Sequence, residues 1–275
     1  MERIAITGGK GGTGKSTVAT ALAYALSKEK KVLLADADAD CPNDHLLLDT
    51  ERKLVRKICQ RIPEFDLTKC TKCGRCGDAC KPKAIVAVKG KAPIFLQRQC
   101  NGCGACRIAC TDNAINWEKK EVGKIFKATK ENLSLISGEL NTGEVMSELI
   151  VKSLNDEIEK LEDNFDYIII DTAAGAHCPV ISAIEKADRI ITVTEPTPLG
   201  EHDLEVILSV IKKLGKEGDI IINRSGIGDE SGIEKVSESF GARILMRIPY
   251  SRKIVDAYAR SVPIEIKDLE KAVEK

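Results

Sequence analysis

Short runs of aliphatic and β-branched residues recur along the 275-residue chain, and longer polar stretches of helical character separate them. Apolar runs of about five residues are typical of parallel strands that are buried on both faces. The predicted strands span residues 3–7, 31–35, 167–170, 189–193, 219–222 and 243–248. Because these strands alternate with helical stretches, the pattern predicts an α/β fold with a mostly parallel, doubly wound sheet.

Composition excludes several classes of protein. The hydrophobic content of 43% suffices for a packed core, and the formal net charge of zero gives no overall basic field that would favour DNA or anionic lipid. The longest apolar runs are far shorter than the ~20 residues of a membrane helix. Met1 leads directly into a strand-like run, without the pattern of a signal peptide. We therefore expect a cytoplasmic protein with neither a nucleic-acid nor a membrane partner.

A glycine-rich loop follows the first predicted strand and precedes an Ala- and Leu-rich helical stretch over residues 18–27. The loop contains the G-x4-G-K-[ST] pattern, whose backbone amides surround nucleotide phosphates at a helix N-terminus. The pattern predicts an ATP site in which Lys15 contacts the β- and γ-phosphates and the Ser16 hydroxyl ligates Mg2+. A glycine turn without a ligand is the weaker alternative. The expected nucleotide-binding residues of the loop are Gly9, Lys10, Gly11, Gly12, Thr13, Gly14, Lys15, Ser16 and Thr17.

Acidic residues end two further predicted strands. Asp36, Asp38 and Asp40 follow the second strand, and Asp171 follows the third in a D-T-A-A-G segment. Carboxylates at the carboxyl ends of parallel strands point into the crevice where ligands bind. Four apolar residues followed by aspartate form the Walker B pattern, so Asp171 is expected to hold Mg2+ through water. The alternative for the acids after the second strand is that they cap the segment that follows.

Eight of the eleven cysteines form two ladders with the spacing C-x2-C-x2-C-x3-C. The ladders are Cys70, Cys73, Cys76 and Cys80, and Cys100, Cys103, Cys106 and Cys110. This spacing holds 4Fe-4S clusters in bacterial ferredoxins, and a reducing cytosol favours metal binding over disulfides. Zinc is the alternative, but zinc sites normally pair two C-x2-C knuckles across a variable gap.

The two ladders lie in similar blocks, CTKCGRCGDACKPKAI and CNGCGACRIACTDNAI, so the segment is an internal repeat that resembles a two-cluster ferredoxin. The resemblance implies that the two halves exchange their fourth cysteine. One 4Fe-4S cluster is then expected on Cys70, Cys73, Cys76 and Cys110, and the other on Cys100, Cys103, Cys106 and Cys80. The proline that usually follows the fourth cysteine is absent, because Lys81 follows Cys80 and Thr111 follows Cys110.

Lys10 is a second lysine just inside the glycine loop, and the resulting GKGGTGKST resembles the deviant Walker A motif of the MinD, ParA, Mrp and nitrogenase iron protein group. The resemblance implies an ATPase in which Lys10 reaches the nucleotide of a partner protomer, so that two protomers enclose two ATP molecules. A cation supplied in trans stabilises transition-state charge. The partner is expected to be a second copy or a paralogous subunit. A solvated loop lysine is the alternative.

The same resemblance assigns roles to further residues. Asp38 is the carboxylate expected to orient the attacking water, Asp36 lies near the Mg2+ shell, and the Gly175 amide senses the γ-phosphate. The resemblance also places Asn223 on adenine and the backbone of Pro249 in the base pocket. Lys10, Lys15, Asp38 and Asp171 are thus the expected catalytic residues.

Three cysteines lie outside the ladders. We expect Cys59 to pack as a small apolar residue near the boundary of the repeat. Cys41 lies after the second predicted strand. Cys178 follows Asp171 at the spacing of a cluster-binding cysteine of the nitrogenase iron protein, but no second ligand is evident. Burial without chemistry is therefore the expectation for Cys178, and a cluster shared across the dimer is the alternative.

The whole chain resembles a P-loop ATPase domain, residues 1–60 and 118–275, interrupted by a small α+β ferredoxin-like domain, residues 61–117. Two functions follow from this combination. In the first, ATP binding and hydrolysis gate electron transfer through the 4Fe-4S clusters to a redox partner. In the second, the chain assembles or delivers a metallocofactor to an acceptor protein. A membrane- or DNA-positioning role like that of MinD or ParA is disfavoured, because the C-terminal segment 266–273 lacks a bulky apolar face.

Overall fold

The computed structural model describes residues 1–273. The chain folds into two compact units. We call Met1–Arg56, Lys124–Glu139 and Ser147–Lys275 the sheet unit, and Lys57–Gly123 with Leu140–Met146 the cysteine unit. The long strands β3 (Lys53–Phe65) and β6 (Ile115–Lys130) contain residues of both units. The two units are therefore joined by continuous strands.

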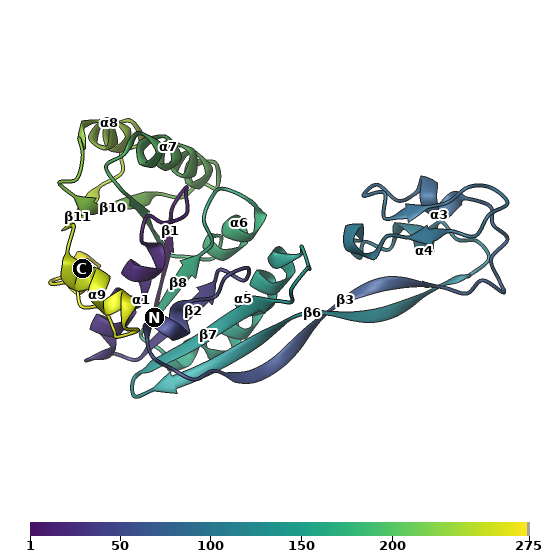
Figure 1. Cartoon of the computed structure of the whole chain (residues 1–275), viewed down its shortest axis with the longest axis horizontal. Helices are drawn as coiled ribbons and strands as arrows, with labels where there is room; N and C mark the ends of the chain where they lie inside the picture. Colours follow the sequence, from purple (N-terminus) through teal and green to yellow (C-terminus); the bar gives the residue numbers. More distant parts are fainter. Residues whose placement is uncertain (274–275) are drawn as a thin grey trace. The chain divides into compact units, whose positions relative to one another are not determined.

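A nine-stranded sheet is the centre of the sheet unit, in the order β11-β10-β9-β1-β8-β2-β7-β6-β3 (Figure 1). Neighbouring strands from β11 to β7 are parallel. Only two residues connect β6 to β7, and so short a connection requires an antiparallel hairpin. Besides β3 and β6, the strands are β1 (Glu2–Thr7), β2 (Val32–Ala37), β7 (Leu133–Leu140), β8 (Tyr167–Thr172), β9 (Arg189–Thr194), β10 (Gly218–Ser225) and β11 (Ile244–Pro249).

Helices cover both faces of this sheet. Leu135 on β7 belongs to the core that contains α1, whereas Gly138, an odd number of residues further on, faces Ile150 of α5. Helix α6 joins α5 on that face, since Asn155 Nδ2 donates to the Ser182 carbonyl at 2.7 Å. The helices of the unit are α1 (Lys15–Ser27), α2 (Asp44–Leu47), α5 (Ser147–Leu161), α6 (Cys178–Ile184), α7 (Pro198–Lys213), α8 (Ser231–Phe240), α9 (Arg252–Ala259) and the short 3-10 turns Glu162–Asn164 and Glu270–Ala272.

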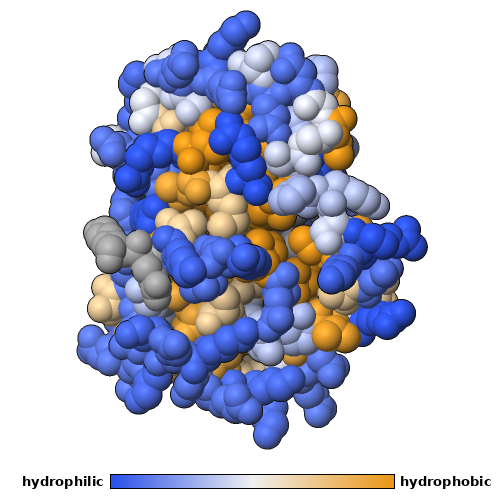
Figure 2. Space-filling model, turned by 90° about the vertical axis from the view of Figure 1, so that its left-hand side faces the viewer, coloured by the Kyte–Doolittle hydropathy of each residue, from blue (hydrophilic) through white to orange (hydrophobic). Residues whose placement is uncertain are grey.

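The segment after α9 packs into the α1 side of the core. Ile264, Leu269 and Val273 are buried there, and the side chain of Arg189 donates to the carbonyl of Val273 at 3.1 Å. Beside this segment, Figure 2 shows apolar side chains between polar ones on the face over β11 and α9. A groove there is lined by residues that include Tyr24, Ile254 and Val262. No helix among residues 1–273 combines the length and apolar character needed to cross a membrane.

Each of the six strands expected from the sequence occurs in the sheet, which confirms the α/β class and the mostly parallel sheet. The strands β3, β6 and β7 were not expected, so the strand that carries Asp171 is not the third in the chain. For β3 and β6 the cause is composition, because charged residues are interspersed among the apolar ones and no long apolar run forms. Asp36 and Asp171 also lie inside the ends of β2 and β8 rather than beyond them.

The cysteine unit repeats one backbone pattern. Helix α3 (Arg75–Asp78) begins after Gly74 with φ 88°, and helix α4 (Ala105–Ile108) begins thirty positions later after Gly104 with φ 80°. Positive φ values recur in the same way at Lys83 and Asn113. The remaining elements are the antiparallel pair β4 (Ile85–Val86) and β5 (Ile94–Phe95) and the 3-10 turn Gln97–Gln99. The small core combines five cysteines with six aliphatic and aromatic residues.

Candidate functional site

A cavity of about 520 Å3 opens beside the glycine loop between β1 and α1. Of the residues expected from the sequence, those that line it are Gly11, Gly12, Gly14, Lys15, Ser16, Thr17, Asp38, Asn223 and Pro249. Residues that are far apart in the chain thus meet here, because the loops after parallel strands gather at one edge of the sheet. Gly9, Lys10 and Thr13 belong to the same loop but do not line the cavity.

Glycine is required at position 14. The residue has φ 96°, and a Cβ there would lie 2.2 Å from Asn223 Nδ2. That amide nitrogen donates to the Thr13 carbonyl at 2.8 Å, and Asn223 Oδ1 accepts the Arg224 N–H at 2.9 Å. Asn223 is therefore fixed against the glycine loop at the edge of the cavity, where it could contact a base.

Lys15 is the buried cation of the loop. Its Nζ donates to the carbonyl of Lys10 at 3.1 Å. Burial lowers the pKa of Lys15, and the carboxylates of Asp171 and Asp38 oppose that effect. Because a backbone carbonyl is neutral, it does not cancel the positive charge of Lys15, and that charge can still attract phosphate oxygens.

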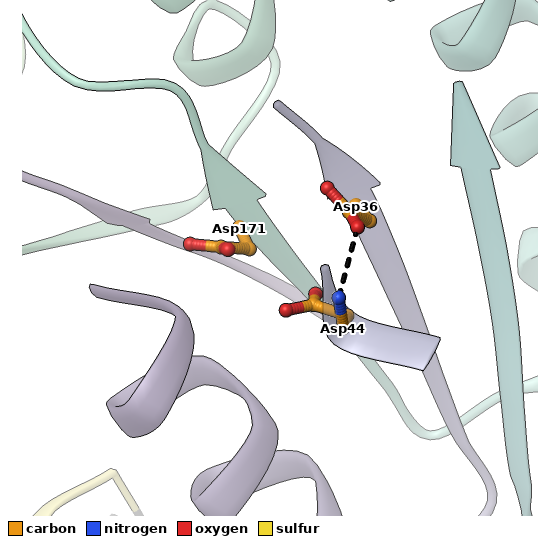
Figure 3. A group of neighbouring side chains, drawn as sticks. All are labelled: Asp36, Asp44 and Asp171. Carbon is orange, nitrogen blue, oxygen red and sulfur yellow. Dashed lines mark hydrogen bonds between the residues drawn. The ribbon is translucent and has the colours of Figure 1, made fainter. Parts of the chain in front are cut away.

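Three buried carboxylates converge beside the loop (Figure 3). Asp36 on β2 and Asp171 on β8 are register neighbours in adjacent parallel strands, and Asp44 comes from the start of α2. Each of the three residues is 1% exposed, and one ligand oxygen from each lies within 4.8 Å of the others. Asp36 is held in place because it accepts the N–H groups of Asp38 and Asp44, each at 3.2 Å.

The electrostatics of this group favour a cation. Burial raises the pKa of Asp36 and of Asp44 well above the ordinary value, and it raises the pKa of Asp171 to about 7. Asp44 Oδ2 and Asp171 Oδ1 are buried without a hydrogen-bond partner. Mg2+ prefers oxygen ligands of this kind, so the residues fit the metal expected with the nucleotide. Asp44 was missed from the sequence, and its only signal was an additional acid eight residues after Asp36.

Of two further expected nucleotide contacts, Asp38 lines the cavity, whereas the Gly175 amide is engaged elsewhere. Asp38 is half-buried, and burial raises its pKa while Lys15 opposes the rise. The Gly175 amide donates to the Gly8 carbonyl at 3.1 Å. Sensing of a γ-phosphate by Gly175 would therefore require that hydrogen bond to break.

Lys10 forms an ion pair within its own chain. Its Nζ lies 2.6 Å from Glu195 Oε1, and the same carboxylate pairs with Arg224. Burial alone raises the pKa of Glu195, but the two cations outweigh it and lower the pKa overall. Glu195 was not among the expected residues, because its role depends on the placement of β9 beside β1.

Two further cavities lie in the cysteine unit, and each is lined by four cysteines. Cys70, Cys73, Cys76 and Cys110 line the first, and Cys80, Cys100, Cys103 and Cys106 line the second. Each cavity thus takes three cysteines from one ladder and the fourth from the other.

Backbone amides point at several of these sulfurs. Ala84 N–H donates to Cys80 Sγ at 3.2 Å. The equivalent hydrogen bond in the second half of the repeat, thirty positions later, runs from Ala114 N–H to Cys110 Sγ at 3.4 Å. Burial raises the pKa of the Cys106 thiol to about 11. A thiol of this kind is protonated near neutral pH, and metal binding favours its thiolate form. The donor set therefore fits an iron–sulfur cluster in each cavity, with four thiolates and N–H groups directed at sulfur.

The three cysteines outside the ladders are all exposed. The expectation that Cys59 packs as an apolar residue is wrong, because alternation along β3 turns Ile58 and Gln60 inward and Cys59 outward. The expectation that Cys178 is buried is also wrong, because it is the first residue of α6. Neither finding tests the cluster that Cys178 could share with a partner.

Known proteins resemble the whole chain. The uncharacterized protein MJ0579 of Methanocaldococcus jannaschii is 36% identical over 263 residues, covering 94% of this chain and 90% of that protein. The septum site-determining protein MinD of Thermotoga maritima is 24% identical over 272 residues, covering 96% and 80%. Among solved structures, MinD of Pyrococcus horikoshii with Mg-ADP matches with a TM-score of 0.56 and 23% identity, over 95% of this chain and 86% of that one.

A family model described as the CobQ/CobB/MinD/ParA nucleotide binding domain matches residues 4–264. This range includes the glycine loop, the three convergent aspartates and the cavity-lining residues near the ends of β10 and β11. The chain therefore belongs to the CobQ/CobB/MinD/ParA family of nucleotide-binding domains.

Proposed function

We propose that this protein binds and hydrolyses ATP and couples its nucleotide state to electron transfer through two 4Fe-4S clusters. The observation that carries the proposal is the grouping of eight cysteines into two cavities of four. Each group contains the fourth cysteine of the opposite ladder, which is the ligand exchange of two-cluster ferredoxins. Family membership supports the nucleotide half of the proposal.

In the proposed hydrolysis, this chain's residues bind the phosphates, orient the attacking water and hold the metal that neutralises charge. Lys15 and the glycine-loop amides bind the phosphates, and Ser16 with the convergent aspartates would hold Mg2+, which neutralises developing charge. Asp38 orients the attacking water. Lys10 acts across a dimer, with a second copy or a paralogous subunit as partner, after it leaves Glu195.

The proposed coupling follows the course of the chain. Asp44 belongs to the carboxylate group, and Lys53 begins β3 nine residues later. Between them, Arg52 is fixed to β7 by hydrogen bonds to Ser137 Oγ at 3.0 Å and to Glu139 Oε2 at 2.8 Å. A change around the nucleotide would therefore be passed to the start of β3 through this anchored segment.

Strand β3 also contacts the second cysteine ladder. The buried Gln60 donates from Nε2 to the Cys100 carbonyl at 2.7 Å. A Cβ on Gly102 would lie only 2.8 Å from the Arg61 carbonyl oxygen, so the loop approaches β3 closely. The second ladder thus contacts β3, a strand whose first residues, Lys53–Arg56, belong to the sheet unit. Hydrogen bonding around a cluster adjusts its reduction potential.

Assembly or delivery of a metallocofactor is the second candidate. The exposed Cys73 and Cys103, one in each cavity, would give an acceptor protein access to a cluster. Complete four-cysteine ligation argues instead for resident clusters, and we prefer electron transfer.

Anaerobic purification followed by iron, sulfide and ATPase assays tests the proposal. We expect two four-iron clusters, hence about eight iron atoms and eight sulfides per chain, together with Mg2+-dependent ATP hydrolysis. Lys15→Ala is the matched control, because it should keep the iron and lose hydrolysis. A folded, colourless and iron-poor protein would overturn the electron-transfer half. Loss of iron to an acceptor protein during ATP turnover would favour the delivery function.

A further inference from the structure

We infer that an acidic electron-carrier protein docks at one of the two cysteine-lined cavities, which we call the first cavity. It is lined by Cys70, Cys73, Cys76 and Cys110, and the second cavity is lined by Cys80, Cys100, Cys103 and Cys106. The docking rests on the cluster half of the proposed function, because one electron passes between the carrier and the 4Fe-4S cluster of the first cavity. It concerns the cysteine unit alone.

The neutral chain is divided into two units of opposite charge. The cysteine unit contains 13 Lys and Arg residues against seven Asp and Glu, a formal charge of +6, so the rest of the chain carries −6. An oxidised 4Fe-4S core with four thiolates carries about −2, so two bound clusters still leave the cysteine unit cationic. The zero net charge of the chain therefore conceals a basic unit, and such a unit attracts acidic partners.

Cations gather at the first cavity. Lys72, Arg75 and Lys91 line it, and Asp112 is the one acidic residue of the described chain in that lining. Lys72 and Lys91 come from separate segments that are joined by the hydrogen bond from Gly90 N–H to the Lys72 carbonyl, 2.8 Å long. By contrast, none of the residues 1–273 that line the second cavity is charged. The two halves of the repeat thus share their cysteine pattern but differ in charge.

The cations of the first cavity are available to a partner. Lys72, Arg75 and Lys91 are exposed, and within the part of the chain that the structure describes none of the three side chains forms an ion pair. Arg75 Nη1 donates to Thr111 Oγ1 at 2.8 Å, which holds the guanidinium in place without neutralising it. Exposed charges of this kind steer an oppositely charged protein towards the surface that carries them.

The arginines near the second cavity are arranged differently. The guanidinium groups of Arg61 and Arg107 lie over the ring of Trp117, at 5.8 and 5.9 Å from its centroid, and Trp117 lines that cavity. Attraction between a cation and an aromatic face holds such groups against the ring. The arginines therefore cover the indole, whereas the cations of the first cavity have no aromatic partner among residues 1–273.

Apolar side chains beside the cations favour a protein as the partner. Lys91 lies in the turn of the β4–β5 hairpin, whose outward pair is Val86 with Ile94, 48% and 62% exposed. Electron-transfer complexes are small interfaces in which charge steers the encounter and short apolar contacts complete it. Single-stranded nucleic acid would need aromatic side chains for its bases, but the exposed large apolar side chains described in the cysteine unit are aliphatic.

Anaerobic titration calorimetry of the iron-loaded protein with a plant-type 2Fe-2S ferredoxin, an acidic electron carrier, tests the inference. We expect binding that weakens as salt is raised, and Lys72→Gln/Lys91→Gln should bind at least about fivefold more weakly at low ionic strength. Lys81→Gln/Lys83→Gln is the matched control, because it removes the same charge at exposed positions on either side of Pro82, which lines the second cavity. It should change the affinity less than about twofold.

The control is also matched in backbone conformation. Lys72 has φ 56° and Lys83 has φ 59°, so each double variant changes one lysine of positive φ. Stopped-flow absorbance of electron exchange with the reduced ferredoxin gives a second readout, and its bimolecular rate should fall only in Lys72→Gln/Lys91→Gln. A basic c-type cytochrome should not bind.

Three results would overturn the docking site. They are the absence of salt-dependent binding to the ferredoxin, equal weakening in the two double variants, and tighter binding of a single-stranded oligonucleotide that is lost with Lys72 and Lys91. Iron content, measured on every sample, separates this failure from that of the proposed function. Iron-poor wild type contradicts the clusters themselves, whereas iron-loaded protein with equal affinities contradicts the docking site alone.

Discussion

Lys10 Nζ lies 2.6 Å from Glu195 Oε1 of the same chain, and Glu195 is 6% exposed. The lysine that the family resemblance assigns to a partner's nucleotide is therefore paired in cis in this structure. Arg224 shares the carboxylate and directly follows Asn223, which is fixed to the glycine loop. The ion pair thus connects the lysine to the segment expected to read the base.

Replacement of Lys10 by alanine should separate binding from turnover. We expect ATP affinity to stay within a few-fold of wild type, because the side chain does not line the cavity. Turnover should fall by about 10^2 or more, since a cation supplied in trans contributes about 10^3 to 10^5 in related P-loop systems. Steady-state ATPase assays and equilibrium nucleotide binding measure the two effects. Full-speed turnover would show that Lys10 has no role in trans.

Glu195→Gln should release Lys10 and ease dimer formation. Each partly buried ion pair is worth about 1 kcal/mol and a dimer breaks two of them, so the protein concentration at half-dimerisation with ATP should fall about thirtyfold. Analytical ultracentrifugation with a slowly hydrolysed ATP analogue measures this. Glu217→Gln, at an exposed position before β10, is the control and should leave the midpoint unchanged. A higher half-dimerisation concentration in Glu195→Gln would mean that the Lys10–Glu195 ion pair stabilises the dimer.

The stability of the metal- and nucleotide-free protein should fall as pH rises. Burial raises the pKa of Asp171 to about 7, above its ordinary value, so the folded state favours the protonated carboxyl. The stabilisation is complete below the unfolded-state pKa and is lost as pH rises through about 7.

Asp171→Asn removes this titration. Its free energy of unfolding should exceed that of wild type at pH 8 by on the order of 2 to 4 kcal/mol, and by less at pH 6. Urea unfolding in chelator at the two pH values measures the difference. If the free energy of unfolding had the same pH dependence in wild type and variant, the raised pKa of the buried Asp171 carboxyl would be contradicted.

Ligand exchange between the two ladders can be tested with Cys80→Ser. The variant should lose the cluster on Cys100, Cys103 and Cys106, although Cys80 belongs to the other ladder. After anaerobic alkylation, mass spectrometry should find those three cysteines modified, and Cys70, Cys73, Cys76 and Cys110 protected. Modification of Cys70, Cys73 and Cys76 instead would show that each ladder holds its own cluster.

Trp117 offers a second readout of the same variant. It is the only tryptophan of the chain, and it lines the cavity with Cys80. A bound cluster should quench its fluorescence, so emission should rise in Cys80→Ser. Cys70→Ser, in the other cavity, should leave more of the quenching in place.

The local sequence was sufficient to predict those parts of the site that are formed by short, continuous segments of the chain. The glycine loop, the Walker B aspartate and the two ladders each depend on residues that are close in the chain. In the loop and the ladders, glycines with positive φ shape the backbone, and Asp171 follows a short apolar run. Asp44 and Glu195 could not be predicted in the same way. Asp44 acts because α2 turns it toward β8, and Glu195 because β9 lies beside β1.

The strands that join the two units were missed for a different reason. In β3 and β6, charged residues are interspersed among the apolar ones, so no long apolar run marks these strands. Pairing with each other and with β7 outweighs their weak individual signals. The exposure of Cys59 follows from the same alternation, since its face of β3 is the polar one.

The most direct test of the coupling is the reduction potential of the clusters, measured anaerobically with and without ATP in wild type and Lys15→Ala. We predict a nucleotide-dependent shift on the order of 30 mV or more in wild type, about a threefold change in a one-electron equilibrium, and none in the variant. Identical potentials in all four conditions would contradict a link between the nucleotide site and the cysteine unit.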